Sequence, residues 1–159
     1  MRIGDDEYVF EGGKAFGCLD YGRGIWRYGC FWNWGAASGV QNGHTIGLNL
    51  GGSWTDGTGM TENGVCVDGR LTKIGGDLDF DYDAANFMRP WKVRTRKSGR
   101  VDLRFEPFFE RVAKTDLLLM KSEVHQVFGH YSGSVVAEGG DEVTIDGLVG
   151  WVEQHTARW

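Results

Sequence analysis

Apolar and polar residues alternate along most of the chain in short runs, and a turn signal separates each run from the next. Such alternation is typical of β-strands with one buried face. Four dipeptides between apolar runs favour hairpin turns: Asn42-Gly43, Asp68-Gly69, Ser98-Gly99 and Gly139-Gly140. The pattern predicts strands over 14–20, 30–39, 44–51, 61–67, 70–75, 77–82, 91–97, 100–106, 116–121, 123–136, 142–146 and 147–156. Only 83–89 and 107–113 are compatible with a helical turn. We therefore predict an all-β, antiparallel protein.

The hairpin that turns at Gly99 allows its register to be predicted. If a three-residue loop ends at a left-handed Gly99, Trp91 lies opposite Phe105 and Arg94 lies opposite Asp102. One face is then apolar and the other charged, as a half-buried antiparallel pair requires. A two-residue loop would mix the two faces. A run of such hairpins closes naturally into a barrel, because closure removes the exposed edges.

Length and charge limit the classes of protein to which the chain can belong. The 159 residues suit one domain with a buried core, and the net charge of −5 is not that of a general nucleic-acid binder. Residues 1–10 lack the apolar core of a signal peptide, and no run of about 20 apolar residues indicates a membrane span. We therefore expect a cytoplasmic protein.

Metals and cofactors are not expected from the motifs. Cys18, Cys30 and Cys66 have no zinc-type spacing, and we expect reduced thiols. The four histidines show no ligand pair such as HxH. The glycine-rich stretch 51–59 lacks the lysine and the helix that a phosphate loop needs.

Residues 28–55 contain no Asp, Glu, Lys or Arg, although 25% of the chain is charged. The segment alternates aromatic and amide side chains: Trp32, Asn33, Trp34, Asn49 and Trp54. That character is typical of a lined cavity, and equally of a sugar-binding face. Trp32 and Trp34 point to one side of a strand and Asn33 to the other. The alternative is that the tryptophans are core residues and the amides satisfy nearby backbone.

Two glutamates on predicted strands are candidates for acid–base chemistry. Glu62 has small neighbours, and Glu153 shares a strand face with Trp151. A carboxylate in water-poor surroundings has a raised pKa and can act as a general acid or base, as hydration, cyclisation or isomerisation of an alkene or enol needs. Alternatively, both glutamates face solvent or pair with arginines such as Arg23. Arg23 itself lies between aromatic residues, where it can stack and anchor a carboxylate ligand or pin the open end of the barrel.

Five strings carry a resemblance to a known family: DYGRGIW (20–26), WNWGAASG (32–39), IGLNLG (46–51), TENGVCVDGRL (61–71) and EQHTARW (153–159). Together they are similar to an uncharacterised bacterial family of unknown function. The resemblance implies a lipocalin-like (calycin) fold, distantly akin to carotenoid hydratases and tocopherol cyclases. Members have two barrel-like halves, and this chain resembles the C-terminal half alone.

We therefore predict one antiparallel, lipocalin-like β-barrel over residues 1–159 whose interior is lined by 28–55. It is expected to bind, or to perform acid–base chemistry on, a small and largely apolar molecule. The predicted site comprises catalytic Glu62 and Glu153 and ligand-binding Arg23, Trp32, Asn33, Trp34, Asn49, Trp54, Asn63 and Trp151. The alternatives are a carbohydrate-binding β-sandwich and a purely structural barrel half. A preceding barrel domain or a second copy of the chain is the expected protein partner.

Overall fold

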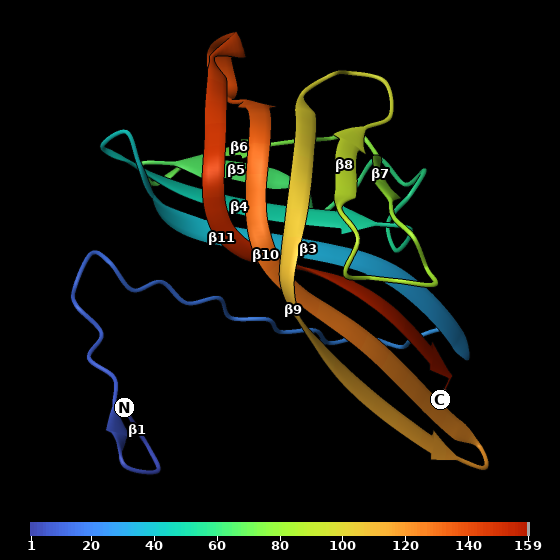
Figure 1. Cartoon of the computed structure of the whole chain (residues 1–159). Coiled ribbons are helices and arrows are strands. Elements are labelled where there is room, and N and C mark those ends of the chain that lie inside the picture. Colours follow the sequence, from blue (N-terminus) through green and yellow to red (C-terminus); the bar gives the residue numbers. More distant parts are fainter. Residues whose placement is uncertain (159) are drawn as a thin grey trace.

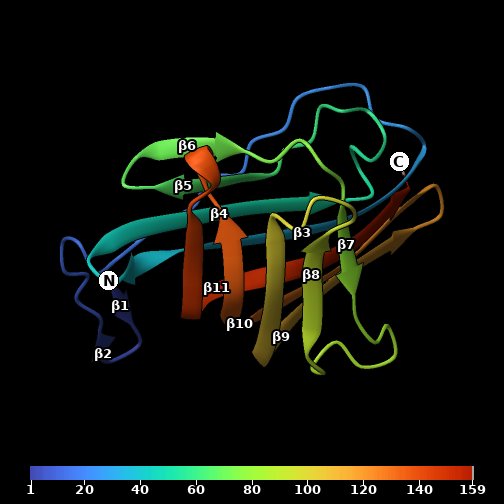
Figure 2. The same cartoon turned by 90° about the horizontal axis from the view of Figure 1, so that it is seen from above.

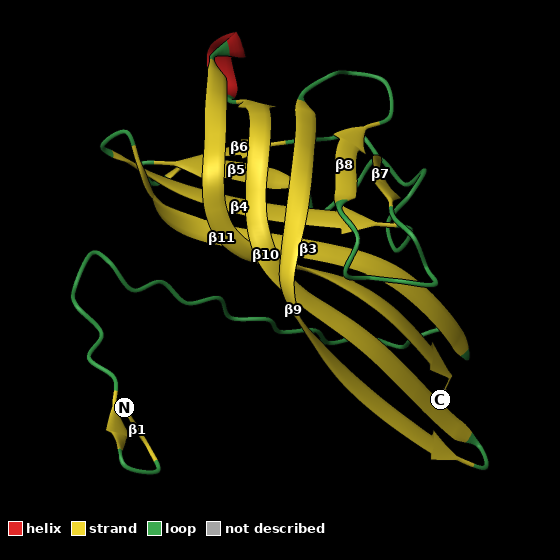
Figure 3. Ribbon diagram, in the orientation of Figure 1, coloured by secondary structure: helices red, strands yellow, loops and turns green. Residues whose placement is uncertain are grey.

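The structure is a computed structural model that describes residues 1–158, and β-strands dominate it (Figure 3). The strands are β1 (Arg2–Ile3), β2 (Asp6–Glu7), β3 (Gly29–Gln41), β4 (His44–Gly52), β5 (Gly64–Val67), β6 (Arg70–Lys73), β7 (Leu78–Asp81), β8 (Trp91–Thr95), β9 (Val101–Leu117), β10 (Met120–Val136) and β11 (Glu142–Arg158). The helical content of this part of the chain is a single 3-10 turn, η1 (Glu138–Gly140), too short to cross a membrane. The all-β prediction is confirmed. Trp159, which ends the last of the family-like strings, lies outside the described residues.

One antiparallel sheet of nine strands forms the body of the protein, in the order β6-β5-β4-β3-β11-β10-β9-β8-β7. The sheet curls into a half-barrel (Figures 1 and 2). The hairpin argument implied full closure, but β6 and β7 are the two edges of the sheet and do not pair with each other. Arg100 links β6 to β10, because its guanidinium donates to the carbonyls of Lys73 and Val136, each at 3.2 Å.

The concave face of the sheet carries the hydrophobic core. Alternate residues of the strands meet there, and their side chains are removed from water. The largest fully buried side chains are Trp91, Tyr131, Phe105, Ile46, Leu50, Ile74, Leu78, Leu103 and Ile145. Because successive strand residues point to opposite faces, the same alternation sends every second residue to the outer, convex face.

Four of the predicted strands differ from the structure. The strand predicted over 116–121 instead contains the turn between β9 and β10. β9 runs on through 107–113, where a helical turn had been allowed, and β11 joins the two strands predicted within 142–156. Shifts of register between Phe128 and Gly129 and between Tyr131 and Gly133 mark bulges. A bulge bends a strand without ending it, so long strands can follow the curl of the sheet. No strand forms over 14–20.

The register predicted for the hairpin at Gly99 is confirmed. Trp91 pairs with Phe105 and Arg94 pairs with Asp102, and Gly99 has a φ of 65°. A Cβ built at Gly99 meets no atom within 4 Å, so a substitution there strains the backbone without causing a clash.

Replacing Gly99 with Val should therefore destabilise the protein through backbone strain alone. We expect Gly99→Val to cost about 1–2 kcal/mol, because a β-branched residue tolerates a left-handed φ poorly. Thermal unfolding followed by circular dichroism measures this cost, with Ser98→Ala as the matched control in the same loop. Equal melting temperatures for the two variants would contradict the turn assignment.

Candidate functional site

The predicted tryptophans lie on the outer face of the sheet, opposite the core. Trp34 pairs with Glu153 and Trp32 with His155, and each pair points away from the concave side, where Val152 belongs to the core. The expectation that 28–55 lines the interior with its tryptophans is therefore wrong. This segment contributes to both faces, because its small and aliphatic residues (Ala37, Ile46, Leu48 and Leu50) fill the core instead.

Five indole rings gather on this outer side, and we call them the tryptophan face: Trp26, Trp32, Trp34, Trp54 and Trp151. Trp54 meets Trp26 and Trp32 with ring centroids 5.0 and 5.9 Å apart, and Trp34 meets Trp151 at 5.3 Å. All three contacts are edge-to-face, with planes inclined by 62°, 63° and 74°. Trp26 and Trp54 remain 42% and 41% exposed. The face is therefore an angular aromatic surface that solvent reaches at its Trp26 and Trp54 end.

A chain of hydrogen bonds joins Trp34 to the predicted acid Glu62. The indole Nε1 of Trp34 donates to Asn49 Oδ1 at 2.9 Å, and Asn49 Nδ2 donates to the backbone carbonyl of Glu62 at 2.8 Å. The Glu62 side chain lies over Gly51, where any Cβ would overlap it. Gly51 pairs with Trp34 across the strands. The lack of a side chain at Gly51 is thus what lets a carboxylate lie beside the tryptophan.

The surroundings of Glu62 make its carboxyl group hold a proton more strongly than usual. Desolvation raises the pKa of Glu62 most, and the charge of Asp20 raises it further. The hydrogen bond from Asn49 and the charge of Lys73 act in the opposite direction without cancelling the rise in pKa. The residue as a whole is exposed, so the shielding from water concerns the carboxylate against Gly51. A proton donor and acceptor therefore lies at the edge of the tryptophan face.

The raised pKa of Glu62 predicts how its replacement changes stability with pH. A raised native pKa contributes stability below the unfolded value, near 4.3, and that contribution is lost as pH rises through the native pKa. Glu62→Gln removes the titration, so the variant should match the parent protein at pH 4 and melt above it at pH 7. Glu142→Gln, at an exposed strand start, is the control. A Glu62→Gln variant that melts below the parent at pH 7 would mean that the ionised carboxylate is stabilising.

The second predicted acid, Glu153, belongs to a polar group that the sequence did not reveal. Its side chain is only 12% exposed, and Oε1 lies 3.7 Å from His155 Nδ1. The other ring nitrogen of His155, Nε2, lies 2.9 Å from Ser122 Oγ. The His155 ring is tilted against Trp32, with centroids 4.0 Å apart. Ser122 comes from β10, and only the register between β10 and β11 brings it to His155, which is why sequence spacing gave no signal.

One polar atom on the tryptophan face has no partner. The indole Nε1 of Trp151 is buried and makes no hydrogen bond within the part of the chain described here. Buried hydrogen-bond donors almost always have an acceptor, so an unpaired buried N–H of this kind is unusual. Trp151 lies edge-on to Trp34, between Trp34 and Phe128.

Two other predicted site residues, Asn33 and Asn63, lie away from the tryptophan face. Asn33 is on the core side, where Nδ2 donates to the backbone carbonyl of Glu153 at 3.2 Å and to the Tyr82 hydroxyl at 3.3 Å. Asn63 is buried, with its side chain bonded to backbone groups. Arg23 is exposed and makes no hydrogen bond or ion pair with the residues up to 158. Asn33 therefore supports the strand that carries Glu153. Arg23 lies between Gly22 and Gly24, which border the Trp26 ring.

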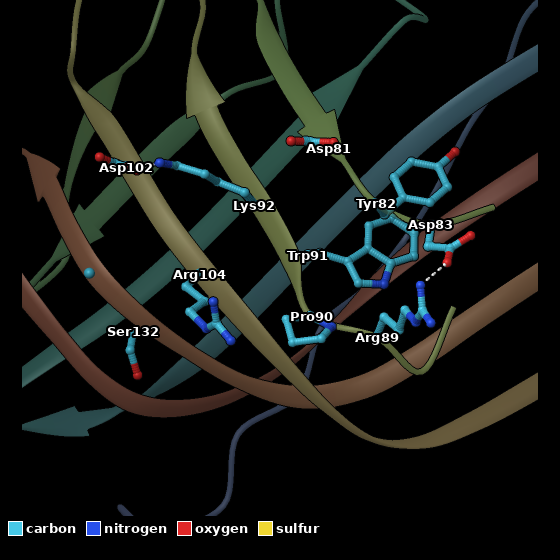
Figure 4. A pocket seen from close by; sticks show the side chains of 11 residues that line it. Asp81, Tyr82, Asp83, Arg89, Pro90, Trp91, Lys92, Asp102, Arg104 and Ser132 are labelled. Atoms are coloured by element: carbon cyan, nitrogen blue, oxygen red, sulfur yellow. Dashed lines mark hydrogen bonds and ion pairs between the residues drawn. The ribbon is translucent and has the colours of Figure 1, made fainter. Parts of the chain in front are cut away.

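A separate groove of about 640 Å³ opens over β7, β8 and β9 (Figure 4). Its charged side chains are largely paired: Arg89 lies 2.8 Å from Asp83, and Lys92 lies 3.5 Å from Asp102. It shares no residue with the tryptophan face. Ion pairs of this kind at a surface contribute little and leave few groups free for a ligand.

The three cysteines Cys18, Cys30 and Cys66 are free thiols. Within residues 1–158, no group of three or more His, Cys, Asp or Glu side chains is arranged to hold a metal ion.

The fold and the site define an all-β half-barrel with an aromatic and acidic outer face. Over residues 1–159 the chain matches the family described as Domain of unknown function (DUF2804), and it belongs to that family. The curated proteins and the solved structures yield no match to the chain. The family assignment thus agrees with the resemblance to a family of unknown function and supplies no reaction.

Proposed function

We propose that the protein binds a small, largely apolar molecule on the tryptophan face, and that Glu62 exchanges a proton with a polar group of that molecule. The observation that carries this proposal is the gathering of five indole rings on the outer face, one of which, Trp34, is hydrogen-bonded through Asn49 to the residue that supplies the acid. Neighbouring aromatic rings that solvent reaches, as at Trp26 and Trp54, are typical of an interaction site. A carboxyl group with a raised pKa at such a surface suits general acid or base chemistry.

The hydrogen-bonding groups of the face favour a ligand with at least one polar atom. Protonated Glu62 is a donor, and ionised Glu62 is an acceptor. A mostly apolar molecule that carries a carbonyl or a hydroxyl group would satisfy these groups while its apolar body covers the rings.

The angles between the rings favour this ligand class over a sugar. A carbohydrate platform presents aromatic rings in a flat row on which sugar rings stack. Here the Trp54 ring is inclined by 62° to Trp26 and by 63° to Trp32, so the three rings form a corner and not a plane. A corner of edge-to-face rings suits a compact apolar body.

Titration with Nile red, a neutral apolar dye, tests the proposal. Binding beside the indoles should quench tryptophan emission and raise dye emission through energy transfer. Trp34→Ala and Trp54→Ala should each weaken dye binding roughly tenfold, which corresponds to about 1.4 kcal/mol of lost contact. Phe108→Ala, which removes an exposed aromatic ring outside the tryptophan face, is the control and should bind as the parent does.

The outcome separates the competing hypotheses. Equal dye binding by all three variants would remove the tryptophan face as the binding site. Loss of folding in both Trp variants, without a separable loss of binding, would make the rings structural. Quenching by a soluble oligosaccharide, with no response to Nile red, would favour the carbohydrate hypothesis.

A further inference from the structure

Ser122, His155 and Glu153 form a relay of the kind that activates a serine hydroxyl. Ser122 Oγ lies 2.9 Å from His155 Nε2, within the hydrogen-bond reach that a nucleophile and its base need. Glu153 Oε1 lies 3.7 Å from His155 Nδ1, on the opposite side of the ring. Each imidazole nitrogen therefore faces one partner, in the order carboxylate, imidazole, hydroxyl.

The sheet holds these three side chains in a fixed arrangement. Glu153 and His155 are two residues apart on β11 and so share its outer face, and β10 places Ser122 beside them through the pairing of Ser122 with Ala157. The side chains of His155 and Glu153 are only 14% and 12% exposed, which limits competition from water. The Trp32 ring, 4.0 Å from His155, restricts the imidazole further. Ser122 is half-buried, so solvent reaches part of the residue.

We propose that Ser122 is the nucleophile of an acyl-transfer site that takes carboxylic esters with an apolar acyl group. Glu153 is a positioning residue: at 3.7 Å it acts on His155 as a nearby charge and not as a hydrogen-bond acceptor, and a negative charge on this side of the ring favours the tautomer with the proton on Nδ1, which leaves Nε2 free to accept. Trp32, in contact with both His155 and Trp54, gives the apolar part of the ester a surface to cover. This goes beyond the binding proposal, since it requires a covalent step at a residue that the binding proposal does not use.

The chemical step balances without any added reagent except water. Ser122 Oγ forms a bond to the ester carbonyl carbon while its proton passes to His155 Nε2. The bond from that carbon to the alkoxy oxygen then breaks, and the leaving alcohol takes the proton from His155. Water repeats the sequence on the acyl-serine, releases the carboxylic acid and restores the Ser122 hydroxyl.

Labelling with an alkyl fluorophosphonate tests the proposal on the full chain. Ser122 Oγ would displace fluoride from phosphorus, and intact-mass spectrometry would show one adduct that peptide mapping places at Ser122. Ser122→Ala should abolish the adduct, and His155→Gln should slow labelling at least tenfold. Ser134→Ala, which changes another partly buried serine of β10, is the matched control and should label as the parent does.

Two further readouts separate this role from a structural one. Glu153→Gln should slow labelling at an unchanged melting temperature, which a purely structural contact would not do. Ser122→Ala should bind Nile red as the parent does, so failure of this proposal and failure of the binding proposal are distinguishable. The proposal is overturned if the folded parent protein gives no Ser122 adduct while a known serine esterase is labelled. Labelling at the parent rate in His155→Gln overturns it as well.

Discussion

Asn63→Ala should lower the stability of the protein by several kcal/mol and leave ligand binding per folded molecule unchanged. The Asn63 side chain is 1% exposed and uses both ends: Oδ1 accepts from the Gly51 amide at 2.6 Å, and Nδ2 donates to the Gly76 carbonyl at 3.1 Å. Truncation to Ala leaves the Gly51 amide and the Gly76 carbonyl without a hydrogen-bond partner. Each unpaired buried group lowers the free energy of unfolding by about 1–3 kcal/mol. Asn63 thereby ties the end of β4 to the chain that leads from β6 to β7.

Asn49→Ala is the matched control for Asn63→Ala. Asn49 is the same residue type, but it is partly exposed and holds Trp34 and the Glu62 carbonyl on the tryptophan face. We expect its loss to weaken Nile red binding more than it lowers the melting temperature. Chemical denaturation and dye titration of both variants measure the two quantities. If Asn63→Ala is as stable as the parent protein but no longer binds the dye, Asn63 is a ligand-binding residue, as the sequence predicted.

Alternation predicts which residues share a face of a strand, but not which face is the core. Asn33 points to the opposite face of β3 from Trp32 and Trp34, as the alternation of side chains along a strand predicts. The pairing of β3 with β11 confirms this placement. Aromatic and amide side chains were predicted to line a cavity. In the structure glycines lie on both faces: Gly35 faces the core, where Tyr131 fills the space over it, and Gly51 lies on the outer face beneath the Glu62 side chain.

Register between distant strands decides the composition of the site, and sequence patterns do not contain it. Asn33 and Asn49 were predicted to serve one cavity, yet Asn33 pairs with Gly52 and Asn49 with Ala36, which places the two amides on opposite faces. The contact of Ser122 with His155 has the same origin, since the two residues are 33 positions apart. By contrast, the hairpin at Gly99 is local, and its loop length alone determines its register.

The prediction that the chain is one barrel half of a larger protein stays a prediction. The nine strands form a curled sheet with two edges and not a closed barrel. Several large apolar residues before β3 are exposed, among them Phe10, Leu19 and Ile25. Size measurement in solution would show whether a second copy covers them.

Gly35→Ala should be among the most damaging conservative substitutions in the sheet, because it forces a side chain into the core tyrosine. A Cβ at Gly35 would overlap the Tyr131 hydroxyl. Tyr131 is fully buried, and its hydroxyl donates to the Trp151 carbonyl at 2.7 Å, so the ring has little freedom to move. Overpacking of this kind costs about 1–3 kcal/mol, and loss of the hydrogen bond adds to it.

The double variant Gly35→Ala/Tyr131→Phe tests whether the cost of Gly35→Ala comes from the contact with the Tyr131 hydroxyl. Tyr131→Phe removes the hydroxyl that the introduced methyl group would meet, so it should cost stability in the parent protein and restore part of the stability in the Gly35→Ala background. This non-additivity is a coupling that a double-mutant cycle measures from four free energies of unfolding. Additive free energies would mean that the backbone at Gly35 shifts to avoid Tyr131. Because Tyr131 holds the carbonyl of Trp151 from the core side, the same cycle measured by Nile red binding shows whether core packing positions the tryptophan face.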